Sequence, residues 1–221
     1  MFDAAIRLII DRGTQGTTLK DIGELAGYSR GLANHRFGSK EGMLLELFAR
    51  FDARWKNHLN GYVGDKVGIA AIEAATRALR DFLKRESDYM RAMYILWYES
   101  LGRASEIRRR LAEHHRVYRA DAARWIERGI QAGEIAPSVN ARQFAIQFCA
   151  FIFGTVYQWL VDADALDLDG LFLDYEANAA RVLGRDDRLD ERRTSRSGRR
   201  RRRPGTRSDE GGRTDEPCAQ R

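Results

Sequence analysis

Apolar residues recur at helical spacing along most of the chain, and the alternating apolar and polar runs typical of β-strands are absent. Near the start, Phe2, Ala5, Ile6 and Ile9 fall on one helical face, and Gly13 follows as an end signal. Because similar patterns continue to about residue 183, the sequence predicts an all-α protein.

Glycines and capping Ser, Thr and Asn residues divide the pattern into segments. Gly61 and Gly64 indicate a boundary between a set of shorter N-terminal helices and a larger helical bundle over 61–184. A connecting helix over about 40–60 joins the two. The expected helices are 2–12, 19–25, 30–37, 40–60, 67–85, 88–101, 105–132, 140–162 and 168–183.

The remaining residues, 185–221, contain almost no apolar side chains and are expected to be disordered. They carry 13 basic and 8 acidic side chains, which account for five of the six net positive charges of the 221-residue chain. The high isoelectric point therefore says little about the folded part. The run Arg199–Arg203 is expected either to add nonspecific DNA affinity or to be a nonfunctional extension.

The two cysteines occur in unlike surroundings, Cys149 in an apolar run and Cys218 in the polar tail. This arrangement is neither a disulfide framework nor a metal-ligand spacing, and it favours a reducing cytoplasm. The apolar run 144–161 contains Gln147 and Gln158 and has acidic flanks. We therefore predict a buried helix there, with a transmembrane span as a distant alternative.

Residues 17–43 contain two short helical patterns that meet at Gly27, an arrangement typical of a helix-turn-helix. The second helix has an apolar side that could dock on the first, formed by Leu32, Ala33 and Phe37. The rest of its circumference is polar, and Gly31 would allow a close phosphate backbone. The spacing alone fits an ordinary surface hairpin equally well. The polar residues that could meet base edges and phosphates are Ser29, Arg30, Asn34, His35 and Arg36.

The segment 4–48 resembles the tetracycline-repressor (TetR) family of bacterial transcriptional regulators in the order and spacing of three motifs, "AAIRLIIDRG", "TTLKDIGELAGYSRG" and "FGSKEGMLLELF". The resemblance implies an α-helical homodimer in which a three-helix N-terminal domain over 1–48 binds DNA, with an effector pocket and the dimer surface in the C-terminal bundle. Most members repress transcription and leave a near-palindromic operator when a small molecule binds.

By position, the resemblance implies that Thr18 contacts a phosphate and that Lys40 anchors another at the start of the connecting helix. Ser29, Arg30, Asn34 and His35 would lie on the recognition helix. Many members carry Tyr and His where this chain has Asn34 and Arg36. Asn can pair with adenine and Arg with guanine or phosphate, so the base preference stays open.

The C-terminal bundle contains many aromatic residues and methionines at helical spacing, most of which should be core. A subset is predicted to line a pocket for an apolar or aromatic effector, with no cofactor. Adjacent helical residues point about 100° apart, so His114 and His115 do not form a metal site, and their charged flanks predict a solvated face. The predicted effector-lining residues are Met93, Trp97, Tyr118, Trp125 and Phe148.

Dimerisation is assigned to the last two helices, from Asn140 and Leu168. The first is apolar around most of its circumference, and Gly154 and Thr155 would let a partner helix approach. Burial within one chain is the competing account.

Enzymatic motifs are absent, including a dinucleotide-binding glycine pattern, HExxH and GxSxG. "FGSKEG" lacks the glycine spacing of a phosphate loop. The sequence thus predicts a cytoplasmic, ligand-responsive repressor without a membrane segment, associated with the nucleoid when it is bound to double-stranded DNA. The alternatives are an interaction protein on a helix-turn-helix fold and, less favoured, an enzyme.

Overall fold

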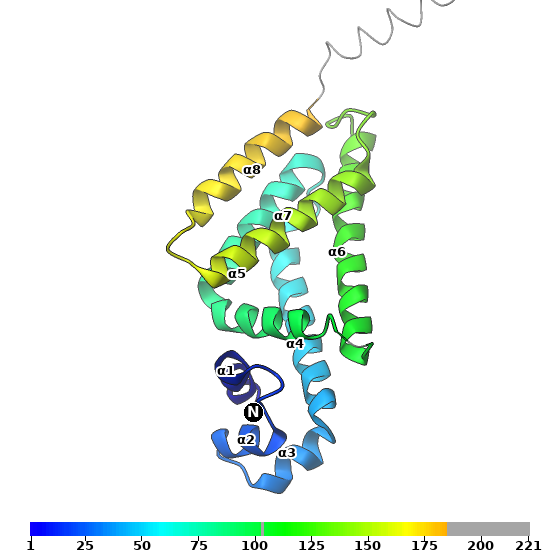
Figure 1. The fold of residues 1–221 in the computed structure, drawn as a ribbon. Helices are drawn as coiled ribbons and strands as arrows, with labels where there is room; N and C mark the ends of the chain where they lie inside the picture. Colours follow the sequence, from blue (N-terminus) through cyan, green and yellow to red (C-terminus); the bar gives the residue numbers. More distant parts are fainter. Residues whose placement is uncertain (103, 185–221) are drawn as a thin grey trace, which may run out of the picture. The chain divides into compact units, whose positions relative to one another are not determined.

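The structure, a computed structural model, describes residues 1–102 and 104–184, apart from the side chain of Arg30. These residues belong to one compact unit that contains eight helices and no strand, which confirms the predicted all-α class (Figure 1). The predictions for residues 185–221, including Arg199–Arg203, fall outside the described residues. The helices are α1 Phe2–Arg12, α2 Leu19–Leu25, α3 Arg30–Phe37, α4 Lys40–Val63, α5 Gly68–Glu99, α6 Glu106–Gln131, α7 Ala141–Val161 and α8 Leu168–Leu183.

Local capping explains the short N-terminal helices. The Thr18 hydroxyl accepts a hydrogen bond from the Asp21 backbone N–H, and the Asp21 carboxylate accepts one from the Thr18 N–H, so a reciprocal capping box begins α2. Gly13 and Gly27 follow α1 and α2 with φ values of 71° and 76°, a left-handed conformation that glycine adopts without steric cost. The turn at Gly27 brings α3 against α2.

Helix α4 runs from the helix-turn-helix into the bundle, where it packs along α5 and α6 (Figure 1). Its buried residues include Leu47, Phe51, Trp55 and Leu59, which recur every four residues and form one continuous face. The helix extends three residues beyond the predicted end at Asn60, because Gly61 remains helical and the chain turns only at the next glycine. The division of the chain near residue 48 stays a prediction.

The prediction of two helices over 67–85 and 88–101 is correct in the position of the break, but in helix α5 the two segments are joined by a kink and not by a loop. Helix α5 is one element with a kink at Glu86, whose φ of −132° and ψ of 30° are not helical. The Glu86 carboxylate forms an ion pair with Arg54 of α4. The chain therefore changes direction without the loop that the sequence pattern suggested.

Helices α7 and α8 complete the bundle, α7 against α6 and α8 against α5. Phe151 of α7 stacks on Tyr175 of α8, with ring centroids 3.9 Å apart and planes 11° apart. By length and composition α7 could cross a membrane, but Phe144, Phe148 and Leu160 are buried in the core of this unit. The predicted buried helix is thus found, although part of its surface is exposed.

Candidate DNA-reading helix and effector cavity

Helix α3 presents most of its polar side chains to solvent. Asn34 and His35 are exposed, and Ser29 occupies the N-cap position, where its hydroxyl makes no capping hydrogen bond. Ala33 is completely buried on the opposite side, 3.4 Å from the position that a Cβ would take at Gly23 of α2. The absence of a side chain at Gly23 therefore allows α3 to pack closely on α2. The side chain of Arg30 lies outside the described part of the structure.

The apolar side of α3 is narrower than the sequence suggested. Phe37 packs edge-on against Phe2 of α1, with ring centroids 5.5 Å apart, and supports α3 together with Ala33. Leu32 was expected on the same side but is 41% exposed. Leu32 directly precedes Ala33, and successive helical residues point about 100° apart, which places Leu32 to one side of the face that Ala33 and Phe37 share. Leu32 instead belongs to the outer face of α3.

Arg36 is held by the scaffold. Its guanidinium donates two hydrogen bonds to the Glu46 carboxylate of α4, at 3.0 and 2.7 Å, and lies 4.9 Å from the Phe37 ring centroid. Hydrogen bonding to Arg36 lowers the pKa of Glu46. A bidentate ion pair of this kind fixes the direction of the Arg36 side chain, so Arg36 connects α3 to α4 in this structure. The guanine or phosphate contact considered from the sequence would require this pair to open.

Thr18 and Lys40, the predicted phosphate contacts, both have structural partners. The exposed Thr18 hydroxyl takes part in the capping box of α2 and donates to Asp21 Oδ2 at 2.7 Å. The ammonium group of Lys40 donates to the Thr14 carbonyl at 3.1 Å, which joins the start of α4 to the loop after α1. An ammonium group has three N–H donors, so Lys40 can keep this bond and still contact a phosphate.

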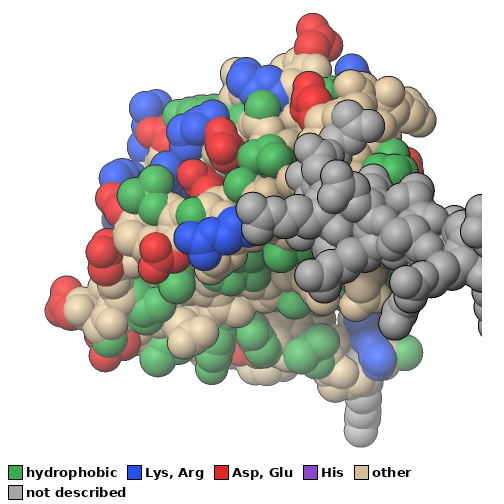
Figure 2. Space-filling view, turned by 90° about the horizontal axis from the view of Figure 1, so that it is seen from above, with side chains coloured by type: hydrophobic (Ala, Val, Ile, Leu, Met, Phe, Trp, Pro, Cys, Tyr) green, Lys and Arg blue, Asp and Glu red, His purple; other side chains and the backbone are tan. Residues whose placement is uncertain are grey.

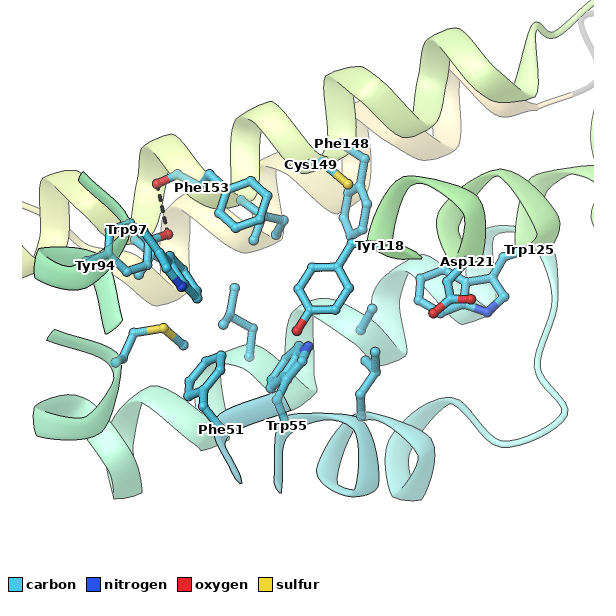
Figure 3. Close-up of a pocket in the computed structure, with 16 residues that line it drawn as sticks. Phe51, Trp55, Tyr94, Trp97, Tyr118, Asp121, Trp125, Phe148, Cys149 and Phe153 are labelled. Atoms are coloured by element: carbon cyan, nitrogen blue, oxygen red, sulfur yellow. Dashed lines mark hydrogen bonds between the residues drawn. The ribbon is translucent and has the colours of Figure 1, made fainter. Parts of the chain in front are cut away.

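A cavity of about 70 Å³ lies between α4, α5, α6 and α7 (Figure 3). Trp97, Tyr118, Trp125 and Phe148 line it, as predicted for the effector pocket. Met93 is fully buried but is not part of the lining, and Met90 takes this place. Met90, Tyr94 and Trp97 share a helical face, whereas Met93 points about 100° away from Tyr94.

The sequence reasoning missed the contribution of α4 to this cavity. Phe51, Trp55 and Leu59 form one wall, and Cys149 and Asp121 also reach it. The four-residue spacing of the three α4 side chains was a visible signal of a buried face. That face was not recognised because the connecting helix was interpreted as a spacer. Helix α4 therefore lines the cavity and also carries Glu46, which pairs with Arg36 of α3.

His114 corrects the prediction of a solvated histidine pair. Its side chain is buried, and its Nδ1 lies 2.7 Å from the Asp52 carboxylate of α4. His114 follows Ile107 and Leu111 and precedes Tyr118 at helical spacing, so it lies on the inward face of α6 while the arginines point outward. His115 is half-buried, 4.4 Å from the Phe153 ring by centroids, and burial lowers its pKa to about 4.

An apolar stripe covers the outer side of α7. Ile146, Ala150, Tyr157 and Val161 are exposed, and a Cβ added at Gly154 would meet nothing within 4 Å. These five positions recur every three or four residues and therefore share one face. Figure 2, a view from above, shows hydrophobic side chains on the lower part of the surface with few charged ones between them. Leu173 of α8 is also exposed.

Two regions of this chain match known protein families, one at the N-terminal end and one in the bundle. Residues 2–47 match the family described as bacterial regulatory proteins, tetR family, and residues 68–170 match a tetracyclin repressor-like C-terminal domain. The HTH-type transcriptional regulator BetI of Rhizobium meliloti (strain 1021) is 27% identical over 156 residues, which are 70% of this chain and 73% of that protein.

Solved structures have the same fold. A TetR transcriptional regulator from Chloroflexus aurantiacus J-10-FL is 22% identical with a TM-score of 0.73, covering 83% of this chain and 93% of that chain. SmeT, the repressor of the Stenotrophomonas maltophilia multidrug efflux pump SmeDEF, is 19% identical with a TM-score of 0.69, covering 84% of this chain and 89% of that chain. The likeness extends across both the helix-turn-helix and the bundle.

Proposed function

Because the chain belongs to the TetR family of bacterial transcriptional regulators, we propose that it is a homodimeric repressor that leaves its operator when an apolar or aromatic effector enters the cavity. The observation that carries this proposal is the position of α4. Glu46, near its start, pairs with Arg36 of α3, while Phe51 and Trp55, farther along the same helix, line the cavity. A displacement of α4 by an effector therefore reorients α3.

On the DNA side, Asn34 and His35 are the proposed readers of base edges, together with Ser29 and Arg30 at the start of α3. Asn can form two hydrogen bonds with adenine in the major groove. The exposed Leu32 suits apolar contact with a thymine methyl group. Thr18 and Lys40 are proposed to contact phosphates, which orients the protein without reading sequence.

The size of the cavity bears on how an effector could enter it. About 70 Å³ is room for a few water molecules, which need roughly 10–15 Å³ each, whereas drug-sized ligands occupy pockets of about 300–1,000 Å³. A drug-sized effector must therefore displace wall side chains as it enters. Since α4 provides one wall, this displacement supplies the coupling between effector and DNA.

The dimer is proposed to form through the stripe on α7, with α8 beside it. Ile146, Tyr157 and Val161 would be buried by the same surface of a second copy, as a two-fold interface requires. Gly154 would allow the partner helix to approach closely. Phe151, which stacks on Tyr175 inside the chain, belongs to the packing between α7 and α8.

The test is selection of bound sequences from random double-stranded DNA, followed by titration of the selected site at several salt concentrations. We expect a near-palindromic site whose half-sites are about one helical turn apart or slightly more. Binding should weaken steeply with salt as phosphate contacts release counterions. Failure to enrich any sequence would overturn the proposal and favour an interaction protein, whereas turnover of a substrate would favour an enzyme. Association with the nucleoid is expected only for the operator-bound form.

A further inference from the structure

Three buried polar atoms beside the cavity have no hydrogen-bond partner within the described residues: Trp97 Nε1, His114 Nε2 and the Tyr118 hydroxyl oxygen. Their side chains are neighbours, because the centroid of the His114 ring lies 4.9 Å from that of Trp97 and 4.1 Å from that of Tyr118. Buried polar groups in proteins are nearly always paired. Three unpaired groups in one place therefore indicate a binding partner that supplies the missing hydrogen bonds.

The three side chains border two adjoining cavities, and Tyr118 is the one that lines both. Trp97 and Tyr118 line the cavity between α4 and α7, and Tyr118 and His114 also line an adjoining cavity that reaches Asp52. In the close-up, the Tyr118 hydroxyl points across the cavity toward α4 (Figure 3). Burial raises the pKa of the Tyr118 hydroxyl, and the neighbouring Trp55 side chain partly opposes this effect, although the two groups do not meet hydrogen-bond geometry. The rest of the wall is almost entirely apolar.

The contact with Asp52 determines whether His114 Nε2 donates or accepts a hydrogen bond, and the chemistry of the other two groups determines theirs. Its carboxylate lies 2.7 Å from His114 Nδ1 and also accepts from Arg110 at 3.2 Å. An ionised carboxylate can only accept, so Nδ1 carries a hydrogen, and in the tautomer that is protonated at Nδ1 alone Nε2 is an acceptor. The Trp97 indole can only donate, and a tyrosine hydroxyl can do either. The site thus offers an acceptor, a donor and a group of both kinds.

We propose that the effector carries a hydroxyl group, phenolic or alcoholic, on an apolar or aromatic body, and that Trp97, His114 and Tyr118 hold this hydroxyl. The hydroxyl donates to His114 Nε2 and accepts from the Trp97 N–H and the Tyr118 O–H. The body lies against apolar walls such as Trp55 and Phe148. This inference rests on the proposed function, since it takes the cavity as the effector site.

Other head groups satisfy the site less well. A carboxylate has no hydrogen for His114 Nε2 and would place a second negative charge near Asp52. An ammonium group has no lone pair for the Trp97 N–H. A hydroxyl supplies both functions from one atom.

The first test is calorimetric titration of the full chain, without DNA, with three probes that share one body: toluene, 4-methylphenol and 4-methylanisole. The last keeps the oxygen but has no hydrogen to donate. We expect 4-methylphenol to bind about tenfold more tightly than toluene, with 4-methylanisole between them, because each hydrogen bond to a buried group is worth severalfold in affinity. Equal affinities, or no measurable binding of 4-methylphenol, would overturn the proposal.

The second test uses two tyrosines that line the same cavity. Tyr118→Phe should reduce the preference for 4-methylphenol over toluene at least threefold and should not lower the melting temperature, because the hydroxyl that it removes has no hydrogen-bond partner among the described residues. Tyr94→Phe is the matched control, since the Tyr94 hydroxyl donates to the Phe153 carbonyl at 3.1 Å. That variant should melt at a lower temperature and keep the wild-type preference.

An unchanged preference in Tyr118→Phe, or a melting temperature as low as that of Tyr94→Phe, would show that the Tyr118 hydroxyl serves the fold rather than a ligand. Neither titration involves DNA. A protein that selects an operator but shows no preference for the hydroxyl therefore refutes this inference alone. A protein that prefers the hydroxyl but selects no operator refutes the proposed function instead.

Discussion

The Glu99 carboxylate, at the last residue of α5, accepts hydrogen bonds from both the backbone N–H and the hydroxyl of Thr14 in the loop after α1. Thr14 is buried, and its carbonyl accepts the hydrogen bond from Lys40. Trp97 of the cavity wall lies two residues before Glu99. The loop between α1 and α2 is therefore held by the end of α5 and the start of α4, the two helices that also line the cavity.

Replacement of this carboxylate should loosen the loop. We expect Glu99→Ala to lower the free energy of unfolding by about 1–3 kcal/mol, because two buried donors of Thr14 lose their acceptor. Denaturant unfolding measures the change, and hydrogen exchange of the Thr14 amide should accelerate. Glu106→Ala is the control, since Glu106 is exposed and pairs with Arg109 one turn away. Equal stability of the two variants would contradict a role for Glu99 in holding the loop.

Asn34 should determine one base in each half-site. Asn34→Ala is expected to weaken binding to the selected operator by about 1–3 kcal/mol and to relax the preference at that position only. Titrations against the operator and against operators with single base changes measure both effects. Equal losses on operator and random DNA would exclude Asn34 as a base reader.

Lys40 should behave differently. Lys40→Ala is expected to weaken binding to all sequences alike and to reduce the slope of log affinity against log salt by about one. It should also lower the melting temperature, because the hydrogen bond to the Thr14 carbonyl is lost. An unchanged salt slope would contradict a phosphate contact at this position.

Gly154 offers a clean test of the dimer. Gly154→Glu introduces no clash within the chain and replaces glycine in a helix interior, a change worth several tenths of a kcal/mol in favour of the helix. We expect a folded monomer in sedimentation and loss of specific DNA binding. The contrasting variant is Phe151→Glu, which should instead destabilise α8 through loss of the Tyr175 stack. If Gly154→Glu still forms a dimer of wild-type affinity, the interface lies elsewhere.

His115 should contribute to acid sensitivity. Burial lowers its pKa to about 4, below the usual 6.5, so the unfolded chain binds the proton more tightly than the folded one. The stabilising contribution is complete above about pH 6.5 and is lost as the pH falls toward 4. We expect His115→Gln to flatten the fall in stability over this window in denaturant titrations at stepped pH. An identical slope in both proteins would show that other groups account for it.

Local signals explain why much of the fold could be predicted. Helix α2 and helix α8 begin and end at the predicted residues, because Thr18 and Asp167 cap them and glycine or a polar turn follows. The break between residues 85 and 88 was also predicted, although neither glycine nor proline lies there, but its form as a kink at Glu86 instead of a loop was not. It depends on how α5 packs against α4, which the pattern within one helix does not contain.

The residues that line the cavity could be predicted only where the face of a single helix determines which side chains point inward. Trp97 and Tyr118 were assigned to the cavity from helical spacing. Met93 and Met90 both fit that spacing, and only the packing of neighbouring helices separates them. The burial of His114 depends on Asp52, 62 residues earlier in the chain, which sequence proximity cannot show. Leu32 was placed on the wrong side because a two-turn helix has too few residues to define a face.

The shared use of α4 also sets how sensitive such a regulator can be. If the operator holds α4 where Phe51 and Trp55 close the cavity, the operator must weaken effector binding by the same factor by which the effector weakens operator binding. A promoter with a near-perfect site would therefore need a higher intracellular dose for release than a promoter with a degenerate site. One protein could in this way switch on several promoters in order, with the weakest site released first.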